Sequence, residues 1–252
     1  MEVTPVEPVV NDTTQGAAKV ASAVAQSVRY QGRKASRRGS EQRRQAILDA
    51  AMRIVIRDGV RGVRHRAVAA EADVPLSATT YYFKDIDDLL NDAFAQYVER
   101  SAVYLARLWQ NTEVILRDML ARNDGSPAGR QCLTRDIARM IQDYIEHQLQ
   151  TRRDQLIAEY AFYLEALINP RLALLVADHQ QILFRGACQF LQVLGSAQPQ
   201  QDAEVLTGMI RRMEYQGLLQ GLTAQAASQR EALLTRQLQQ FLGTAATDPG
   251  QA

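Results

Sequence analysis

Residues 72–86 read ADVPLSATTYYFKDI. A short helical run over 64–72 precedes this stretch and breaks at Asp73-Val74-Pro75, because proline cannot continue a helix but is favoured in the first turn of the next one. A second short run follows over 75–83, and Lys84-Asp85 then leads into a long helix from about Ile86. Two short helices with so tight a break between them indicate a helix-turn-helix unit.

The residues before this unit supply its first helix. Ser40-Glu41-Gln42-Arg43 offers an N-terminal cap, apolar residues follow at helical spacing, and Gly59 is a typical stop residue. We therefore predict a helix over 41–58 and a helix-turn-helix domain over 39–85. Residues 1–38 show no sustained apolar period, so we expect a flexible basic N-terminal arm there.

The remainder of the chain reads as helix, with turn signals only at residues 123–127, 169–170, 195–199 and 221. These signals predict helices near 86–122, 130–151, 152–168, 171–194, 201–220 and 227–242, followed by a loose tail over 243–252. The expected fold class is all-α, with a small N-terminal head and a larger helical body over 86–242.

Charge is distributed unevenly along the chain, although the formal net charge is only +1. Residues 29–84 carry 13 Lys or Arg against five Asp or Glu, which gives +8 and leaves −7 for the rest. A segment this basic is typical of one that contacts a polyanion.

Composition excludes several classes of protein. The chain has 252 residues and is 46% hydrophobic and 23% charged, which is ordinary for a globular protein. No window resembles a membrane span or a signal peptide, so we expect a cytoplasmic protein without membrane partners. We interpret Cys132 and Cys188 as small core residues. No phosphate-binding glycine loop, Gly-x-Ser-x-Gly motif or Cys/His cluster is present, so we expect no enzyme, no catalytic residue, no metal and no cofactor.

The head resembles the TetR family of bacterial one-component transcriptional regulators over about 45 residues. The family's conserved positions stand here as Ile47-Leu48-Asp49-Ala50-Ala51, Gly59-Val60-Arg61-Gly62, Val68-Ala69 and residues 72–86. The chain departs from the family pattern at six positions, Val63, Asp73, Pro75, Ser77, Thr80 and Ile86. The resemblance implies a ligand-responsive regulator, most often a repressor, that binds a palindromic operator as a homodimer.

The expected DNA contacts lie in the helix-turn-helix unit. The second of its short helices offers no side chain able to make a bidentate base contact, so its base readout must be modest. Arg66 is therefore the best candidate for guanine, with a phosphate contact as the alternative, while Tyr82 and Phe83 could simply be core. The full predicted set is Arg43, Arg44, Arg64, His65, Arg66, Leu76, Ser77, Ala78, Thr79, Thr80, Tyr81, Tyr82 and Lys84.

The resemblance also implies a small-molecule cavity and a dimer interface in the body. Aromatic and polar residues at helical spacing give a candidate pocket of Met140, Tyr144, His147, Tyr160, Tyr163, His179 and Phe184, with Glu159 among the interleaved polar groups. Residues at this spacing are more often core than pocket, so a purely structural role is the alternative. The last two helices carry more apolar groups than one small bundle needs. The predicted dimer residues are Val205, Met209, Ile210, Met213, Leu234, Leu238 and Phe241.

Two other functions fit the same residues. A DNA-binding architectural protein could use the head without any effector, and a helical protein–protein adaptor could carry a basic head that only resembles a DNA reader. Steep salt dependence with a residual sequence preference distinguishes a specific DNA-binding protein from both.

Overall fold

The computed structural model describes residues 30–33 and 38–243, and the fold over these residues is all-α, as predicted. Their α-helices are α2 (Arg38–Asp58), α3 (His65–Glu71), α4 (Leu76–Tyr82), α5 (Ile86–Ala121), α6 (Pro127–Thr151), α7 (Arg153–Ala166), α8 (Pro170–Leu194), α9 (Pro199–Gln220) and α10 (Ala224–Phe241). A short 3-10 helix, η1 (Val60–Gly62), lies between α2 and α3. Every predicted helix exists, with its ends within three residues of the predicted ones.

Two of the three largest differences in helix ends, those of α6 and α10, coincide with local caps. Helix α6 begins at Pro127 because the Ser126 hydroxyl accepts a hydrogen bond from the backbone N–H of Gly129. Helix α10 begins at Ala224 because the Thr223 hydroxyl accepts from the N–H of Ala226. Capping satisfies the free N–H groups of the first turn, so each helix extends one turn further toward the N-terminus than its apolar pattern does.

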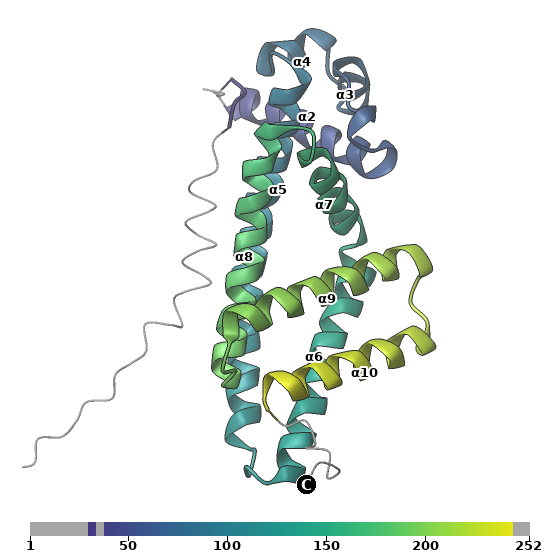
Figure 1. The fold of residues 1–252 in the computed structure, drawn as a ribbon. Helices are drawn as coiled ribbons and strands as arrows, with labels where there is room; N and C mark the ends of the chain where they lie inside the picture. The colour runs from purple at the N-terminus through teal and green to yellow at the C-terminus, as the bar shows by residue number, and fades with distance from the viewer. Residues whose placement is uncertain (1–29, 34–37, 244–252) are drawn as a thin grey trace, which may run out of the picture.

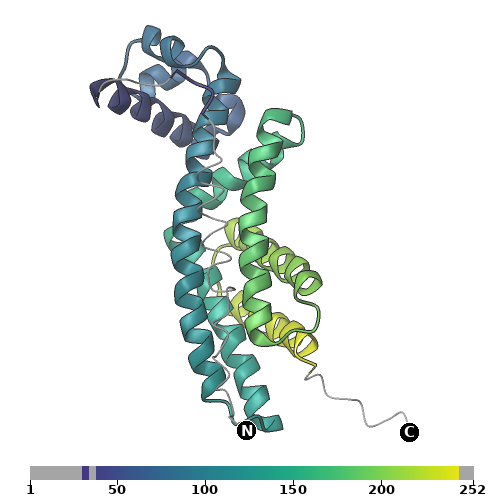
Figure 2. The ribbon, with the colours of Figure 1, turned by 90° about the vertical axis from the view of Figure 1, so that its left-hand side faces the viewer.

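The head of α2, α3 and α4 sits at one end of the molecule, and the body extends away from it (Figure 1). Helices α5 and α8 run side by side along most of the body, whereas α9 and α10 cross it further down (Figure 1). Figure 2 shows α5 passing from the head to the far end of the body without a break. One helix therefore connects the two predicted domains.

Two hydrophobic cores are present, and the first of them joins head and body. It combines Ile47 and Leu48 of α2 and Phe94 of α5 with Phe162 of α7 and Leu172 of α8. The second core lies in the lower body around α6, α8, α9 and α10. The predicted boundary between residues 85 and 86 therefore falls inside a continuous core rather than between two of them.

The turn between α3 and α4 contains a residue in the left-handed region, Asp73, with φ of 51°. Asp tolerates this conformation better than most residues because its short side chain can hydrogen-bond locally. This is one of the positions at which the chain departs from the family's glycine. Asp73 thus adopts a backbone conformation that glycine would also allow.

Residues 30–33, which we call the N-terminal strap, pack against the head and α5. The N–H groups of Gln31 and Gly32 donate to the Asp92 carboxylate at 2.5 and 2.9 Å, and the N–H of Arg33 donates to the carbonyl of Tyr82 at 2.8 Å. The expectation of a flexible arm over 1–38 is therefore wrong for the strap and for the start of α2. Residues 1–29, 34–37 and the predicted tail from 244 onward lie outside the described residues.

The interpretation of both cysteines as core residues is wrong for Cys132, which is exposed, whereas Cys188 is half-buried and packs against the lower core. Cys132 lies on the outer face of α6, which the apolar context did not indicate. Over the described residues, no helix combines the length and the apolar character that crossing a membrane requires.

Candidate nucleic-acid interface and ligand cavity

The exposed face of the head is built by α3, α4 and the residues around them. Ser77, Thr80 and Tyr81 are exposed on α4, and Lys84 is exposed just after it. Arg64 and Arg66 are exposed at the start of α3, and no carboxylate pairs with either within the described part of the chain. Exposed cations and small hydroxyl groups on neighbouring helices suit contacts to a phosphate backbone.

The four other predicted contacts, on α2, α3 and α4, differ in their exposure to solvent. Leu76 is exposed at its first position and Ala78 is half-buried, as is His65 at the start of α3. Arg43 is exposed on α2. These four positions lie on or beside the exposed face and stay predictions as DNA contacts.

Three predicted DNA contacts are instead structural. Thr79 is fully buried and its hydroxyl donates to the carbonyl of Leu76. The Tyr82 hydroxyl lies 2.7 Å from the Ser40 hydroxyl and donates to the Ser40 carbonyl, which holds α4 against the start of α2. Arg44 is buried and pairs with Asp92 at 2.6 Å. None of these side chains is free to reach a phosphate, and Phe83 is fully buried core.

Arg33, which we assigned from the sequence to the basic arm and not to the set of DNA contacts, also lies beside this face. The guanidinium of Arg33, in the N-terminal strap, lies 4.4 Å from the ring centroid of Tyr81, so a cation–π contact attaches the strap to the exposed end of α4. Basic arms can follow a groove of DNA, and the only sequence signal for this contact was the charge of the arm itself.

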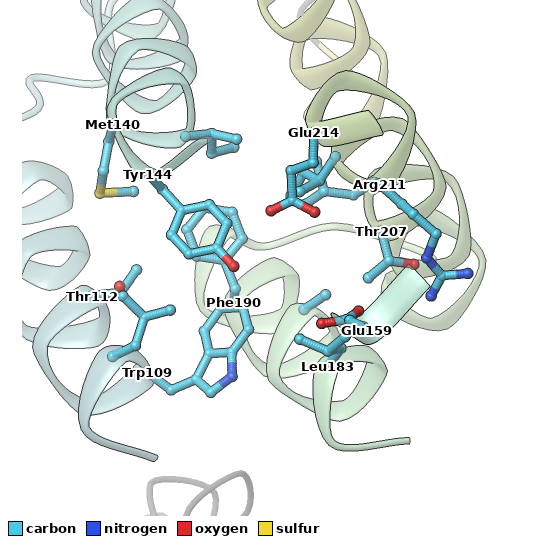
Figure 3. Close-up of a pocket in the computed structure, with 15 residues that line it drawn as sticks. Trp109, Thr112, Met140, Tyr144, Glu159, Leu183, Phe190, Thr207, Arg211 and Glu214 are labelled. Carbon is cyan, nitrogen blue, oxygen red and sulfur yellow. The ribbon is translucent and has the colours of Figure 1, made fainter. Parts of the chain in front are cut away.

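The body contains an apolar cavity of about 110 Å³ between α5, α6, α7, α8 and α9. Figure 3 shows three aromatic side chains around it, Trp109, Tyr144 and Phe190, which come from three different helices. Two carboxylates and a guanidinium complete the lining, Glu159 from α7 with Arg211 and Glu214 from α9 (Figure 3). Cavities of this kind, mostly apolar with a few polar groups, are typical of small-molecule sites.

Two of the predicted pocket residues, Met140 and Tyr144, line this cavity. His179 lies in an adjoining recess of about 40 Å³, which shares Tyr144, Glu159 and Glu214 with the cavity. Its ring lies 2.9 Å from both the Ser101 and the Tyr163 hydroxyls, and burial lowers its pKa. We therefore interpret His179 as a neutral, hydrogen-bonded core residue.

The other four predictions of pocket residues are wrong for this cavity. Tyr163 is committed to His179, and the Tyr160 hydroxyl donates to the backbone carbonyl of Arg211. His147 is exposed and bonded to Thr151, and Phe184 packs against the lower core. Helical spacing placed these residues on the right helices but could not say which face meets the cavity.

Glu214 was not predicted, and it contributes a nearly buried carboxylate to the lining of the cavity. It is 7% exposed, and no described residue forms a hydrogen bond or ion pair with its carboxylate. Burial, followed by the charge of Glu159, raises the pKa of Glu214 to about 8. Glu159 is better placed, because it accepts a hydrogen bond from the Tyr97 hydroxyl at 2.9 Å. No sequence signal distinguished Glu214 from the surface carboxylates.

Most predicted dimer residues lie within the protomer core. Met213, Leu234, Leu238 and Phe241 are buried, mainly where α10 and α9 pack on α6, and Ile210 lines the cavity. Met209 is half-buried, and Val205 is exposed. The prediction is therefore corrected: the stripe through Leu234 and Leu238 covers the chain's own core.

A different apolar stripe is exposed on the outer side of α9. It follows helical spacing and continues past the end of the helix, with one further exposed leucine on α10. Its members are Val205, Tyr215, Leu219, Leu222 and Leu233.

Comparisons with known proteins agree with this architecture. Residues 47–93 match the family model described as bacterial regulatory proteins, tetR family, and residues 134–242 match the tetracyclin repressor-like C-terminal domain. The first model covers most of the head and the start of α5, and the second covers the body from α6 to the end of α10.

A curated relative and two solved structures are similar to the chain. The nicotine-responsive transcriptional repressor HdnoR from Paenarthrobacter nicotinovorans is 34% identical over 71 residues, which is 28% of this chain and 37% of that protein. A TetR-family protein from Streptomyces coelicolor is 28% identical, with 78% of this chain and 98% of that one covered and a TM-score of 0.49. A TetR-family regulator from Mesorhizobium loti is 16% identical, covers 82% and 98% of the two chains and has a TM-score of 0.52, which is a likeness of fold.

The head with its helix-turn-helix, the helical body and both family models therefore lead to the same assignment. The chain belongs to the TetR family of bacterial regulatory proteins.

Proposed function

We propose that this regulator binds a palindromic DNA operator as a homodimer and leaves it when a small molecule occupies the body cavity. The observation that carries the DNA-binding part is the exposed set of Arg64, Arg66, Ser77, Thr80 and Lys84 on and beside α3 and α4. These side chains supply phosphate contacts along α3 and α4 and a guanidinium able to reach a base edge.

The homodimer part is supported by the exposed stripe on α9. Leu219 is 67% exposed and Tyr215 is 50% exposed, and an apolar stripe of this kind is unfavourable in water unless another surface covers it. A second copy of the chain offers an identical stripe, and an isologous pair buries both. Two heads held by such a pair can contact two half-sites, which accounts for a palindromic operator.

The effector part is supported by the position of α5. Its middle lines the cavity at Trp109, and its N-terminal part holds the head through Asp92. A ligand that binds one arrangement of these helices better than another shifts the population of head positions. Repression is supported by HdnoR, the relative named as a repressor, and the proposed role involves no enzymatic step.

The experiment that tests this function is a mobility-shift titration with selected genomic fragments at two salt concentrations. We expect a preferred palindromic site, a steep loss of affinity with salt, and a shifted species that contains two chains. Salt-dependent binding without any preferred site would point to the architectural alternative. Absence of DNA binding at low salt would leave the adaptor.

A further inference from the structure

The chemical class of the ligand is indicated by the buried carboxylate of Glu214. A carboxylate removed from water normally has hydrogen-bond or ion-pair partners, because an unpaired buried charge is unfavourable. Glu214 has none among the described residues, and Figure 3 shows its carboxylate turned toward Tyr144 and the cavity. A ligand in the cavity could therefore supply the hydrogen-bond or ion-pair partner that the Glu214 carboxylate lacks.

The charges around the cavity favour a cation as that partner. Glu159 and Glu214 both line it, and neither forms an ion pair within the part of the chain that the structure describes. Arg211 is the cation of the lining, but its guanidinium lies 5.3 Å from the ring centroid of Tyr163, outside the set that lines the cavity. In Figure 3 it extends past Thr207, away from Tyr144. The lining thus carries two acidic groups against one basic group.

The walls of the cavity suit the same kind of ligand. Trp109, Tyr144 and Phe190 surround the space with aromatic rings, whose faces attract cations. Most of the remaining neighbours, including Leu183 and Ile210, are apolar, although the hydroxyl groups of Thr112 and Thr207 also line the cavity. Apolar walls exclude water, which strengthens any charge interaction inside. A volume of about 110 Å³ limits the ligand to roughly the size of one substituted ring.

We propose that the cavity binds a small organic cation, an aromatic or aliphatic amine or quaternary ammonium, whose positive charge is placed against Glu214 and Glu159 and between the aromatic rings. This inference rests on the proposed function only in treating the bound cation as the effector that controls DNA binding. Binding itself is measured without DNA, so its failure and a failure of operator binding are separate results.

The chain provides its own reporter for the test. Trp109 lines the cavity and is the single tryptophan of the sequence, so its fluorescence responds to occupancy. The probes are phenyltrimethylammonium and tert-butylbenzene, which have the same shape and differ only in charge, with benzenesulfonate as the anion. Each is titrated into the full chain while Trp109 emission is recorded.

We expect the cation to bind at least tenfold more tightly than its neutral isostere, and benzenesulfonate to bind least. Glu214→Gln keeps the shape but cannot give up a proton and become negative beside a bound cation, so it should abolish most of the tenfold preference. Glu204→Gln is the matched control, because Glu204 is exposed on the same helix. This control should bind both probes as the original chain does.

Two outcomes overturn the proposal. One is equal or tighter binding of tert-butylbenzene to the original chain, a result that needs no variant and so is independent of folding. The other is an unchanged preference for the cation in Glu214→Gln once circular dichroism has shown that the variant is helical.

Discussion

The guanidinium of Arg44 on α2 lies 2.6 Å from the carboxylate of Asp92 on α5, and solvent reaches almost nothing of either side chain. The same carboxylate accepts the backbone N–H groups of Gln31 and Gly32. A single acidic residue of α5 thus holds the head and the N-terminal strap. A side chain at position 32 would overlap Phe83 and Asp92, so only glycine fits where the strap approaches them.

Replacing Asp92 with Asn should destabilise the fold by about 3–5 kcal/mol, because Arg44 would remain buried without its counter-charge. Urea denaturation followed by circular dichroism measures the loss. Asp118→Asn, which removes an exposed partner of Arg122 on the same helix, should cost less than about 1 kcal/mol. Equal losses in the two variants would mean that the buried pair contributes nothing special.

Lys84→Ala should weaken binding to every DNA sequence by a similar factor and reduce the salt slope by about one. The reason is that an exposed lysine after α4 is placed for a phosphate rather than a base. Tyr82→Phe serves as a contrast, because its hydroxyl bonds Ser40 and should affect stability by about 1 kcal/mol while leaving DNA affinity intact. Mobility shifts on operator and random DNA decide the matter, and a change in base preference with Lys84→Ala would contradict it.

Arg66→Ala should cost about 1–3 kcal/mol on the operator and relax the preference at one symmetric G·C pair per half-site. Arg33→Ala should instead lower the affinity for all DNA, since Arg33 belongs to the strap and faces Tyr81. Binding to a library with randomised half-sites compares the two variants. A uniform loss with Arg66→Ala would make Arg66 a phosphate contact and leave the operator to be read through DNA shape.

Leu219→Glu should give a folded monomer that no longer binds the operator, because it places a charge in the exposed stripe of α9. Leu234→Glu, at a fully buried position, should unfold the chain instead. Light scattering with circular dichroism separates these effects. If the Leu219→Glu protein were still a dimer, the interface would have to lie on another face of the chain.

Glu214→Gln should stabilise the free protein increasingly as the pH rises from about 5 to 8. The folded chain raises the pKa of Glu214 to about 8, so in this range it holds a proton that the unfolded chain has released. The folded state of the original chain therefore loses stability with rising pH, by at most about 1.4 kcal/mol per pH unit, and the amide variant avoids that loss. Thermal unfolding at several pH values measures the difference, and a gain that is independent of pH would contradict the assignment.

The positions of the helices could be predicted from the sequence because apolar period and turn residues act locally. The burial of Arg44 could also be predicted in part, because Ile47 and Leu48, three and four residues later, lie on the same helix face and belong to the core. We predicted Arg44 as a DNA contact because the residues around it are also basic.

Contacts between distant segments could not be predicted in the same way. An apolar stripe such as Leu234 and Leu238 has the same pattern whether α6 of its own chain or a second copy covers it. Glu159 and Glu214 lie 55 positions apart in the sequence and meet only because α7 and α9 border one cavity. The proposed ligand chemistry therefore depends on the tertiary arrangement.

Because α5 is one continuous helix, a small movement of the helix in the body produces a larger displacement at the head. Trp109 and Asp92 are 17 residues apart on this helix, a span of about 25 Å at 1.5 Å per residue. Tilting the helix by about 5° around Trp109 as a fulcrum would swing Asp92 sideways by about 2 Å, and the head moves with it. In the proposed homodimer the two displacements would combine, so a small side-chain movement that admits a ligand would be enough to shift both heads out of register with the turns of DNA.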